Sequence, residues 1–168
     1  MISKIYQKKI FNLSTLETFL VFLLVILLDQ SCKIFVSKIM IINNFNELKL
    51  MPFLNMVFVR NTGISFGLFS EYENFGRVFF SSFSVIVGSF LIILALLTYN
   101  KLISISLAII SGGAIGNAID RIYFGGVIDF IDIFIYNLHW PSFNLADAFI
   151  TLGVFLLLIE PYFRKKIK

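Results

Sequence analysis

The sequence predicts an integral membrane protein that is mainly α-helical. Its 168 residues are 58% hydrophobic and only 14% charged, and the mean hydropathy is +0.91. A water-soluble domain of this composition would expose far too much apolar surface. Two long segments carry no charge and are close to the length that crosses a hydrocarbon core of ~30 Å as a helix. We therefore expect four transmembrane helices, with short strands outside them.

The first helix is expected at about residues 16–38. Residues 19–28 are strongly apolar but too short to cross a membrane alone, so the helix has to continue past Asp29 and Lys33. An acid and a base four residues apart share one helical face, and an ion pair is the simplest explanation for both. Cys32 is the only cysteine and is expected to be a small residue packed between helices.

Two further apolar segments, at about residues 46–62 and 127–139, are predicted to form strands outside the membrane. Both are rich in strand-forming residues, too short to span as helices and too apolar to lie free in water. Pro52 predicts an edge or a bulge for the first segment. Asn61 and Gly63 predict a turn at its end, with Gly63 at positive φ.

The second and third helices are predicted at residues 78–97 and 102–122, which form the two longest apolar stretches. Residues 112–116 begin and end with glycine, and such small residues permit close contact between helices. Three polar residues follow at the outer end of the third helix: Asn117, Asp120 and Arg121. Asn117 lies deeper and needs a polar partner, whereas the other two could anchor the helix at the membrane interface.

The fourth helix is expected at residues 144–162, because the apolar run at 148–159 is too short to span unless the helix begins near Asn144. Asn144 and Asp147 then share one face of the first turn. One interpretation is an N-cap by Asn144, with Asp147 as a favourable first-turn acid. The other is that both residues belong to a functional site.

The charged residues predict the orientation. Basic residues occur in residues 1–18, in the short connection 99–101 and in the tail after Pro161, and such flanks stay cytoplasmic. Both termini are therefore expected in the cytoplasm, and the two longer connections outside. The net charge of +4 is explained by topology and anionic lipid and does not imply a nucleic-acid partner. We find no linker, so residues 1–168 are expected to form a single membrane-embedded domain.

Asp129 and Asp147 are the main candidates for chemistry. A carboxylate at membrane depth costs about 2.5–3.5 kcal/mol, yet both lie in strongly apolar surroundings. Two converging carboxyl groups could activate a water, as the pair that shares one proton does in aspartic proteases. Six polar residues are expected at one membrane face, and helix capping explains only one or two of them: Asn117, Asp120, Arg121, Asp129, Asn144 and Asp147.

Other chemistries fit the sequence poorly. One cysteine and one histidine cannot form a His/Cys metal site, and an all-carboxylate cation site lacks a recognisable loop. Neither a phosphate-binding loop nor a nucleophile elbow is present, and His139 has no evident partner. No metal, nucleotide or other cofactor is therefore expected.

The polar motifs resemble those of bacterial lipoprotein signal peptidases (signal peptidase II) along nearly the whole chain. In order, they are Asp29-x-x-x-Lys33, Asn61-x-Gly63, Gly116-Asn117-x-x-Asp120-Arg121, Val127-x-Asp129-Phe130 and Phe143-Asn144-x-Ala146-Asp147. The resemblance implies four transmembrane helices with a small extracytoplasmic β-cradle. It also implies an aspartic endopeptidase of the bacterial inner membrane, with its active site toward the periplasm, that cleaves a prolipoprotein just before a diacylglyceryl-modified cysteine.

By the same resemblance, Asp129 and Asp147 are the catalytic pair. The residues implied to bind substrate or support the site are Asn61, Gly63, Asn117, Asp120, Arg121, Asn144, Asp29 and Lys33. Asp132 is a third nearby acid whose role the resemblance does not settle. The expected partners are diacylglyceryl-prolipoproteins and membrane lipids, with no nucleic acid and no stable protein partner.

The expected mechanism is general acid–base hydrolysis, in which Asp147 is ionised because the helix start favours its charge. An ion or proton transporter is one alternative, since polar residues inside a membrane also mark translocation paths. Against it, the acids gather at one face, with no relay across residues 78–97. A non-catalytic membrane assembly subunit is the other alternative, and its polar residues would tolerate conservative change.

Overall fold

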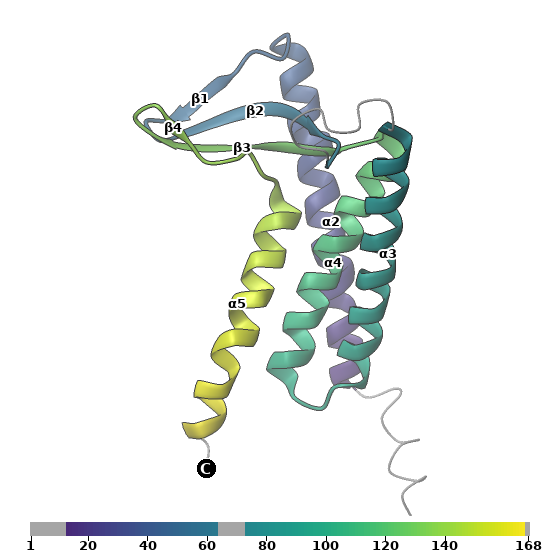
Figure 1. The fold of residues 1–168 in the computed structure, drawn as a ribbon. Helices are drawn as coiled ribbons and strands as arrows, with labels where there is room; N and C mark the ends of the chain where they lie inside the picture. The colour runs from purple at the N-terminus through teal and green to yellow at the C-terminus, as the bar shows by residue number, and fades with distance from the viewer. Residues whose placement is uncertain (1–12, 64–72, 167–168) are drawn as a thin grey trace, which may run out of the picture.

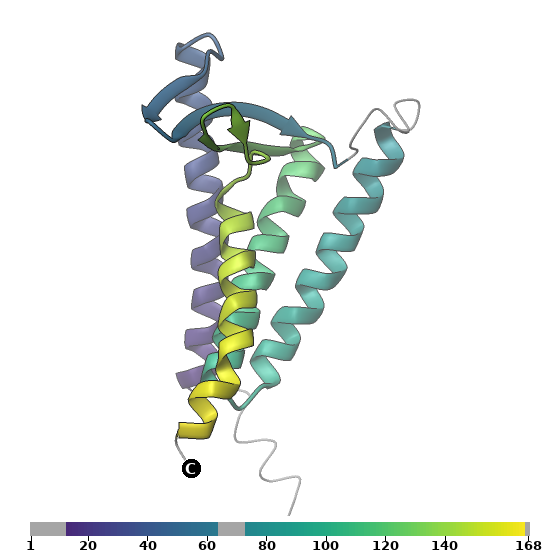
Figure 2. The ribbon, with the colours of Figure 1, turned by 60° about the vertical axis from the view of Figure 1, so that its left-hand side comes forward.

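A computed structural model describes residues 13–63 and 73–166, which form four long helices with a small sheet across one end of the bundle (Figure 1; Figure 2). The helices are α2 (Leu13–Ile42), α3 (Glu73–Leu97), α4 (Lys101–Phe124) and α5 (Leu145–Lys166). Each is long and apolar enough to cross a membrane, over Thr15–Ile42, Gly76–Leu97, Lys101–Phe124 and Leu145–Tyr162. The predicted fold class, four spanning helices with a small sheet, is confirmed.

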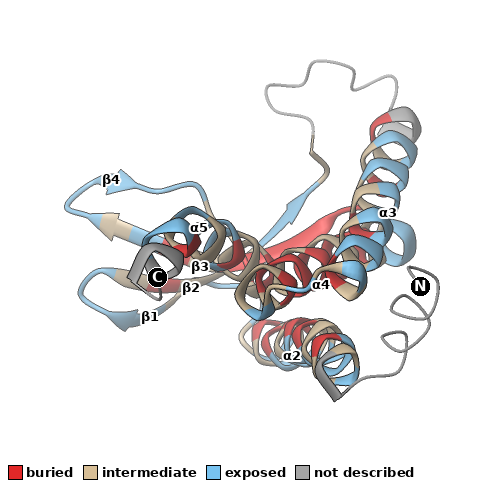
Figure 3. Ribbon diagram, turned by 90° about the horizontal axis from the view of Figure 1, so that it is seen from below, coloured by how far each residue is buried: buried red, intermediate tan, exposed pale blue. Residues whose placement is uncertain are grey.

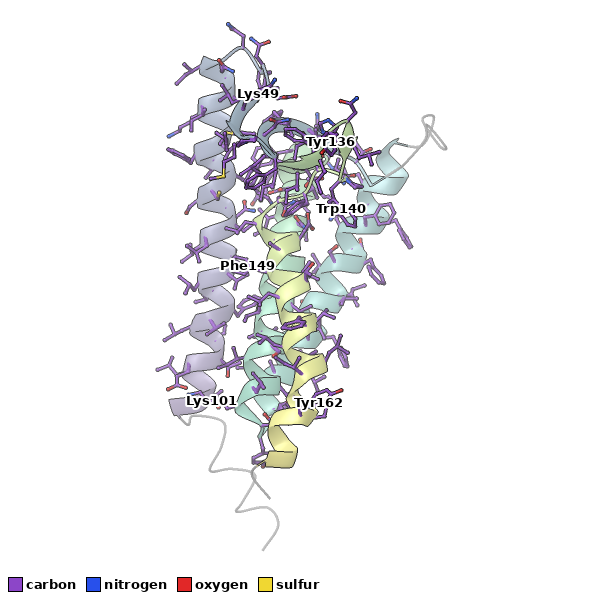
Figure 4. The ribbon with its side chains drawn as sticks, turned by 90° about the vertical axis from the view of Figure 1, so that its left-hand side faces the viewer. Lys49, Lys101, Tyr136, Trp140, Phe149 and Tyr162 are labelled. Atoms are coloured by element: carbon purple, nitrogen blue, oxygen red, sulfur yellow. The ribbon has the colours of Figure 1, made fainter. Side chains whose placement is uncertain are left out.

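The helices extend beyond the segments expected from hydropathy. α2 continues to Ile42 instead of ending near residue 38, and it stops where Asn44 and Phe45 take the left-handed conformation, with φ of 54° and 59°. α3 begins at Glu73, before the uncharged stretch, since a helix can start with a polar turn outside the membrane. Lys101 and Tyr162 lie at the end of the bundle away from the sheet, whereas Lys49 and Tyr136 lie at the sheet end (Figure 4).

α4 is the central helix and packs against the other three (Figure 3). The small residues predicted to allow close contact do so on two sides. An added Cβ at Gly112 would lie 2.7 Å from Val25 in α2, and one at Gly113 would lie 2.6 Å from the carbonyl oxygen of Ala146 in α5. This close packing brings the outer ends of α2, α4 and α5 together, which is where the polar motifs lie.

The sheet is antiparallel, with the order β1-β2-β3-β4. Its strands are β1 (Leu48–Met51), β2 (Leu54–Asn61), β3 (Val127–Ile135) and β4 (Leu138–His139). The first apolar segment, expected as one strand, is instead a hairpin whose turn contains Pro52. β1 does lie at the sheet edge, and its pairing with β2 shifts register between Lys49 and Met51, so the edge and bulge signals of Pro52 apply to β1.

The sheet packs on the outer end of α2 through a buried cluster of Val36, Met40 and Phe130. Cys32, expected between helices, packs against this cluster of α2 and β3 residues. Phe130 follows Asp129 on β3. Burial of the Phe130 ring against α2 therefore helps to fix the position of Asp129 relative to the helices. The sheet therefore places one of the two candidate aspartates, and the helix bundle places the other.

Candidate active site

Asp129 and Asp147, here called the aspartate pair, are brought together at the junction of sheet and bundle. Asp129 lies on β3, where it pairs with Val59 of β2, and it is only 2% exposed. Asp147 lies in the first turn of α5. Asn144 contacts both carboxyl groups: its side-chain Nδ2 donates to Asp129 Oδ1 at 2.7 Å, and its backbone N donates to Asp147 Oδ2 at 3.2 Å. One residue therefore bridges the pair.

Asn144 also caps α5. Its Oδ1 accepts a hydrogen bond from the backbone N of Asp147 at 3.1 Å, while the Asp147 carboxylate accepts from the backbone N of Asn144. This is the reciprocal pattern of a capping box. The cap and the functional site are thus the same structure. Because the cap uses Oδ1, the Nδ2 of Asn144 is left to face Asp129.

Two more asparagines contact the aspartate pair. Asn61 Oδ1 accepts from the backbone N of Gly63 at 2.9 Å, in a turn where Gly63 has φ of 81° as predicted. That contact leaves Asn61 Nδ2 to donate to Asp129 Oδ2 at 2.9 Å. Asn117, predicted to need a polar partner, donates from Nδ2 to Asp147 Oδ1 at 2.8 Å. Each of the four carboxyl oxygens in the pair therefore faces an N–H donor.

Beside the aspartate pair lies a charge cluster, formed by the buried Asp29, Lys33 and Asp120 with the half-buried Gln30 against them. Lys33 Nζ lies 2.8 Å from Asp29 Oδ2, which confirms the predicted ion pair, and also 2.8 Å from Asp120 Oδ2. All three charged side chains are at most 3% exposed. Asp120 is therefore not an interface anchor. The helix contact through Gly116 explains why, since that glycine lets Asp29 of α2 approach α4.

The charge cluster binds residues next to the aspartate pair, through two backbone N–H groups and one side chain. Asp29 Oδ1 accepts from the backbone N of Ala146 at 2.9 Å, one residue before Asp147. Asp120 Oδ2 accepts from the backbone N of Ile128 at 3.2 Å, one residue before Asp129. In addition, Lys33 Nζ donates to Asn117 Oδ1 at 3.1 Å.

Sequence reasoning missed Gln30. Its Nε2 lies 3.1 Å from Asp29 Oδ2, 3.0 Å from Asp120 Oδ1 and 3.1 Å from the carbonyl oxygen of Gly116. A glutamine beside the acidic end of an ion-pair motif carries no periodic or spacing signal. The signal that could have identified it is the need of two buried acids on neighbouring helices, Asp29 and Asp120, for a shared donor.

Arg121 lies beside the site, without a direct contact to the aspartate pair among the described residues. Its Nη1 donates to the backbone oxygen of Asn117 at 3.4 Å, and its guanidinium carbon lies 5.9 Å from the centre of the Phe80 ring. In the part of the chain that the structure describes, its buried Nε has no hydrogen-bond partner. The guanidinium group is thus held near the pair and retains a free donor.

Asp132 belongs to a separate group in the sheet. Its carboxylate accepts from Asn55 Nδ2 at 3.0 Å and lies 2.9 Å from His139 Nδ1. The expectation that His139 has no partner is therefore wrong. The reason is the β3–β4 hairpin, which pairs His139 with Phe134 and brings the imidazole to Asp132. Such a contact depends on the turn geometry, which the sequence does not display.

The environment of Asp129 favours its protonated form. Burial raises the pKa of Asp129 above the ordinary carboxyl value, and the nearby negative charge of Asp147 adds to that effect. Hydrogen bonds from Asn61 and Asn144 act in the opposite direction.

Within residues 13–63 and 73–166, no group of three or more His, Cys, Asp or Glu side chains is placed to bind a metal ion. One protonated and one ionised carboxyl can act together as acid and base.

Comparison with known families decides the assignment. A family model described as signal peptidase (SPase) II matches residues 21–163. The chain belongs to the signal peptidase II family. It is therefore a peptidase, a hydrolase that spans the membrane several times, and the transporter and assembly-subunit alternatives are set aside.

Individual relatives of signal peptidase II agree with this assignment. A lipoprotein signal peptidase of Pelagibacter ubique is 38% identical over 149 residues, which cover 87% of this chain and 88% of that protein. One from Wigglesworthia glossinidia brevipalpis is 41% identical over 136 residues, covering 79% and 86%. A solved structure described as a bacterial membrane enzyme has a TM-score of 0.72 and 31% identity, covering 85% of this chain and 90% of the other.

Proposed function

We propose that this chain is a membrane aspartic endopeptidase that removes the signal peptide from prolipoproteins, cutting just before the diacylglyceryl-modified cysteine. Its membership of the signal peptidase II family supports the peptidase activity, and its lipoprotein signal peptidase relatives support the substrate. The bridge formed by Asn144 supports an aspartic mechanism, because a residue that contacts both carboxyl groups brings them to one place.

In the proposed reaction, Asp147 is ionised and Asp129 is protonated. Asp147 takes a proton from a water whose oxygen attacks the scissile carbonyl carbon, while Asp129 gives its proton to the carbonyl oxygen and stabilises the developing charge. The tetrahedral intermediate then collapses: the C–N bond breaks, Asp147 protonates the leaving amine, and Asp129 recovers its proton from the re-forming carbonyl. No metal, nucleotide or other cofactor takes part.

Two observations support this assignment of protons. Asp147 accepts from a backbone N at the start of α5 and from Asn117, and a helix N-terminus favours an anion. Burial raises the pKa of Asp129, which favours its protonated form. The activity should therefore require the proton on Asp129 and be lost as the pH rises through the raised pKa of this carboxyl.

The other residues of the site would position the substrate and the aspartate pair. Asn61, Asn117 and Asn144 orient the carboxyl groups, and Gly63 forms the turn that orients Asn61. Asp29, Lys33 and Asp120 support the backbone around the pair. Arg121, held beside the site by the backbone oxygen of Asn117 and the Phe80 ring, would add positive charge near the substrate. The diacylglyceryl chains would lie along apolar helix faces open to lipid, such as the exposed Leu152 and Phe155 in α5.

The proposed location is the bacterial inner membrane, with both termini in the cytoplasm and the active site toward the periplasm. The basic tails of the chain support this orientation, since Arg and Lys flanks stay cytoplasmic. Lys101 lies at the end of the bundle away from the sheet (Figure 4). The expected partners are prolipoprotein substrates and membrane lipids, with no nucleic acid and no stable protein partner.

The experiment that tests this function uses the purified full-length protein in detergent with a diacylglyceryl-modified prolipoprotein. We expect a shift in product size, with the new N-terminus at the lipid-modified cysteine. The same prolipoprotein without diacylglycerol should remain uncut. Activity should survive EDTA and a thiol-blocking reagent. Absence of cleavage, or a requirement for a divalent ion, would contradict the proposal.

A further inference from the structure

We infer that Gln30 is a positioning residue that fixes the separation between the carboxyl groups of Asp129 and Asp147. The inference rests on the proposed function of the aspartate pair. Gln30 does not contact either member of the pair. It acts through two buried acids, each of which binds the backbone beside one member.

Each of the two buried acids accepts a hydrogen bond from a backbone N–H group. Asp29 binds the backbone N of Ala146 at 2.9 Å, and Asp120 binds the backbone N of Ile128 at 3.2 Å. Ala146 precedes Asp147 on α5, and Ile128 precedes Asp129 on β3. A change in the distance between the Asp29 and Asp120 carboxylates therefore moves the backbone on the two sides of the site relative to each other.

Lys33 and Gln30 join these two carboxylates. Lys33 Nζ lies 2.8 Å from an oxygen of each, but one ammonium leaves the group of three with an excess negative charge. Gln30 supplies the other connection, from Nε2 to Asp29 Oδ2 at 3.1 Å and to Asp120 Oδ1 at 3.0 Å. Its amide adds N–H donors between two like charges without adding charge.

One oxygen of Asp120 depends on Gln30 for its donor. Lys33 and the backbone N of Ile128 both bind Asp120 Oδ2. Among the contacts of the described residues, Gln30 is the donor to the other oxygen, Oδ1. Asp120 is fully buried, so no water replaces that donor at low cost. Without Gln30, the Asp120 carboxylate has to turn toward another donor, and its hold on Ile128 weakens.

The separation of the aspartate pair has a measurable consequence. Repulsion between two carboxylates falls as their distance grows, and this repulsion spreads the two apparent pKa values of the pair. The pH profile of kcat is bell-shaped between those two values. Carboxyl groups that are farther apart therefore give a narrower pH profile, and their poorer positioning lowers kcat. Substitution of a purely structural residue would change the stability of the protein without shifting the acidic or alkaline limb of the pH profile.

The test compares Gln30→Met, which keeps the length of the side chain and removes the N–H donors, with Ser31→Ala as a matched control at the exposed neighbouring position. The substrate is a peptide with a diacylglyceryl-modified cysteine, and activity is normalised to folded protein. We expect Gln30→Met to lower kcat by about ten-fold or more, since small misplacements of reacting groups are costly. We also expect an unchanged KM and a narrower pH bell, whereas Ser31→Ala should keep the wild-type profile. The inference would be overturned if Gln30→Met had the wild-type kcat and the wild-type pH profile, whatever its melting temperature.

Gln30→Glu keeps the test decisive if Gln30→Met does not fold. A glutamate can donate only when protonated, so its relative activity should improve as the pH falls. An equal loss at every pH would overturn the inference. Failure of the proposed function gives a different pattern: the wild type would not cleave, or Asp129→Asn would cleave normally, whatever the Gln30 variants do.

Discussion

The ammonium group of Lys33 lies 3.1 Å from the side-chain oxygen of Asn117, which also accepts from Asn144 Nδ2 at 3.1 Å, and these two donors decide which end of the Asn117 amide faces Asp147. With Oδ1 bound to Lys33, Nδ2 points to Asp147 Oδ1 at 2.8 Å. A buried ion pair that does not touch the aspartate pair therefore presents a donor to it. The same orientation supports an ionised Asp147, because an N–H group stabilises a carboxylate.

Loss of either carboxyl should end catalysis. Asp129→Asn and Asp147→Asn are close to isosteric, and each should abolish cleavage of the prolipoprotein in detergent while the protein remains folded. Asp132→Asn is the matched control, because this buried acid on the same strand contacts Asn55 and His139 instead of the pair. It should retain most of the wild-type activity per folded molecule. Normal turnover by either the Asp129→Asn or the Asp147→Asn variant would refute the mechanism.

Asn144→Ala should lower both stability and kcat. The variant loses a helix cap, which costs about 0.5–2 kcal/mol, and it removes the amide donor from Asp129. Asn100→Ala provides the comparison, since Asn100 caps α4 through the backbone N of Leu102 and Ile103. That control should melt at a lower temperature and keep its activity per folded molecule. If the two variants lose activity equally, Asn144 acts only as a cap.

Lys33→Met should destabilise the protein strongly. It leaves Asp29 and Asp120 buried without their cation, and removal of one partner of a buried ion pair costs about 3–5 kcal/mol. Lys101→Met is the matched control, because Lys101 and Glu17 form an ion pair with side chains 67% and 44% exposed. An exposed pair contributes at most about 1 kcal/mol. Thermal unfolding in detergent measures both, and similar melting temperatures would contradict the role of the buried cluster.

Asn61→Leu should move the alkaline limb of the pH profile to higher pH. The hydrogen bond from Asn61 lowers the pKa of Asp129, against the larger effect of burial that raises it. Without that bond, the pKa of Asp129 rises further, so this carboxyl keeps its catalytic proton to higher pH. Asn55→Leu removes an amide from the same strand that binds Asp132, and it should leave the limb in place. A shift of the limb to lower pH in Asn61→Leu would contradict the assignment of the proton to Asp129.

Reporter fusions should place the two ends of the bundle on opposite sides of the membrane. Fusions at Lys101 and after Lys168 should give a cytoplasmic signal, and fusions near Asn46 and Tyr136 an external one. The expected result follows from the basic tails and from the position of the sheet at the other end of the bundle (Figure 4). An external carboxyl terminus would overturn the proposed orientation of the site.

The features that the sequence determined by itself are those encoded in local spacing. Apolar length indicates the spanning helices, because every backbone polar group in a membrane has to be satisfied within the helix. A spacing of four brings Asp29 to Lys33, and a spacing of three lets Asn144 cap the helix that contains Asp147. Glycine tolerates positive φ, which predicts the turn at Gly63. Each of these depends on residues within one turn or one helix.

The tertiary structure alone decided which distant polar atoms meet. The contacts of Gln30 with Asp120 and of His139 with Asp132 exist because the close packing of α2 on α4 and the β3–β4 hairpin bring those elements together. The hairpin at Pro52 likewise depends on pairing between β1 and β2. The amide orientation of Asn117 depends on Lys33, 84 positions away in the chain, and on Asn144 of another element. Such contacts are set by side chains that share one buried space, where a polar group has to find a donor or acceptor from whichever element lies against it.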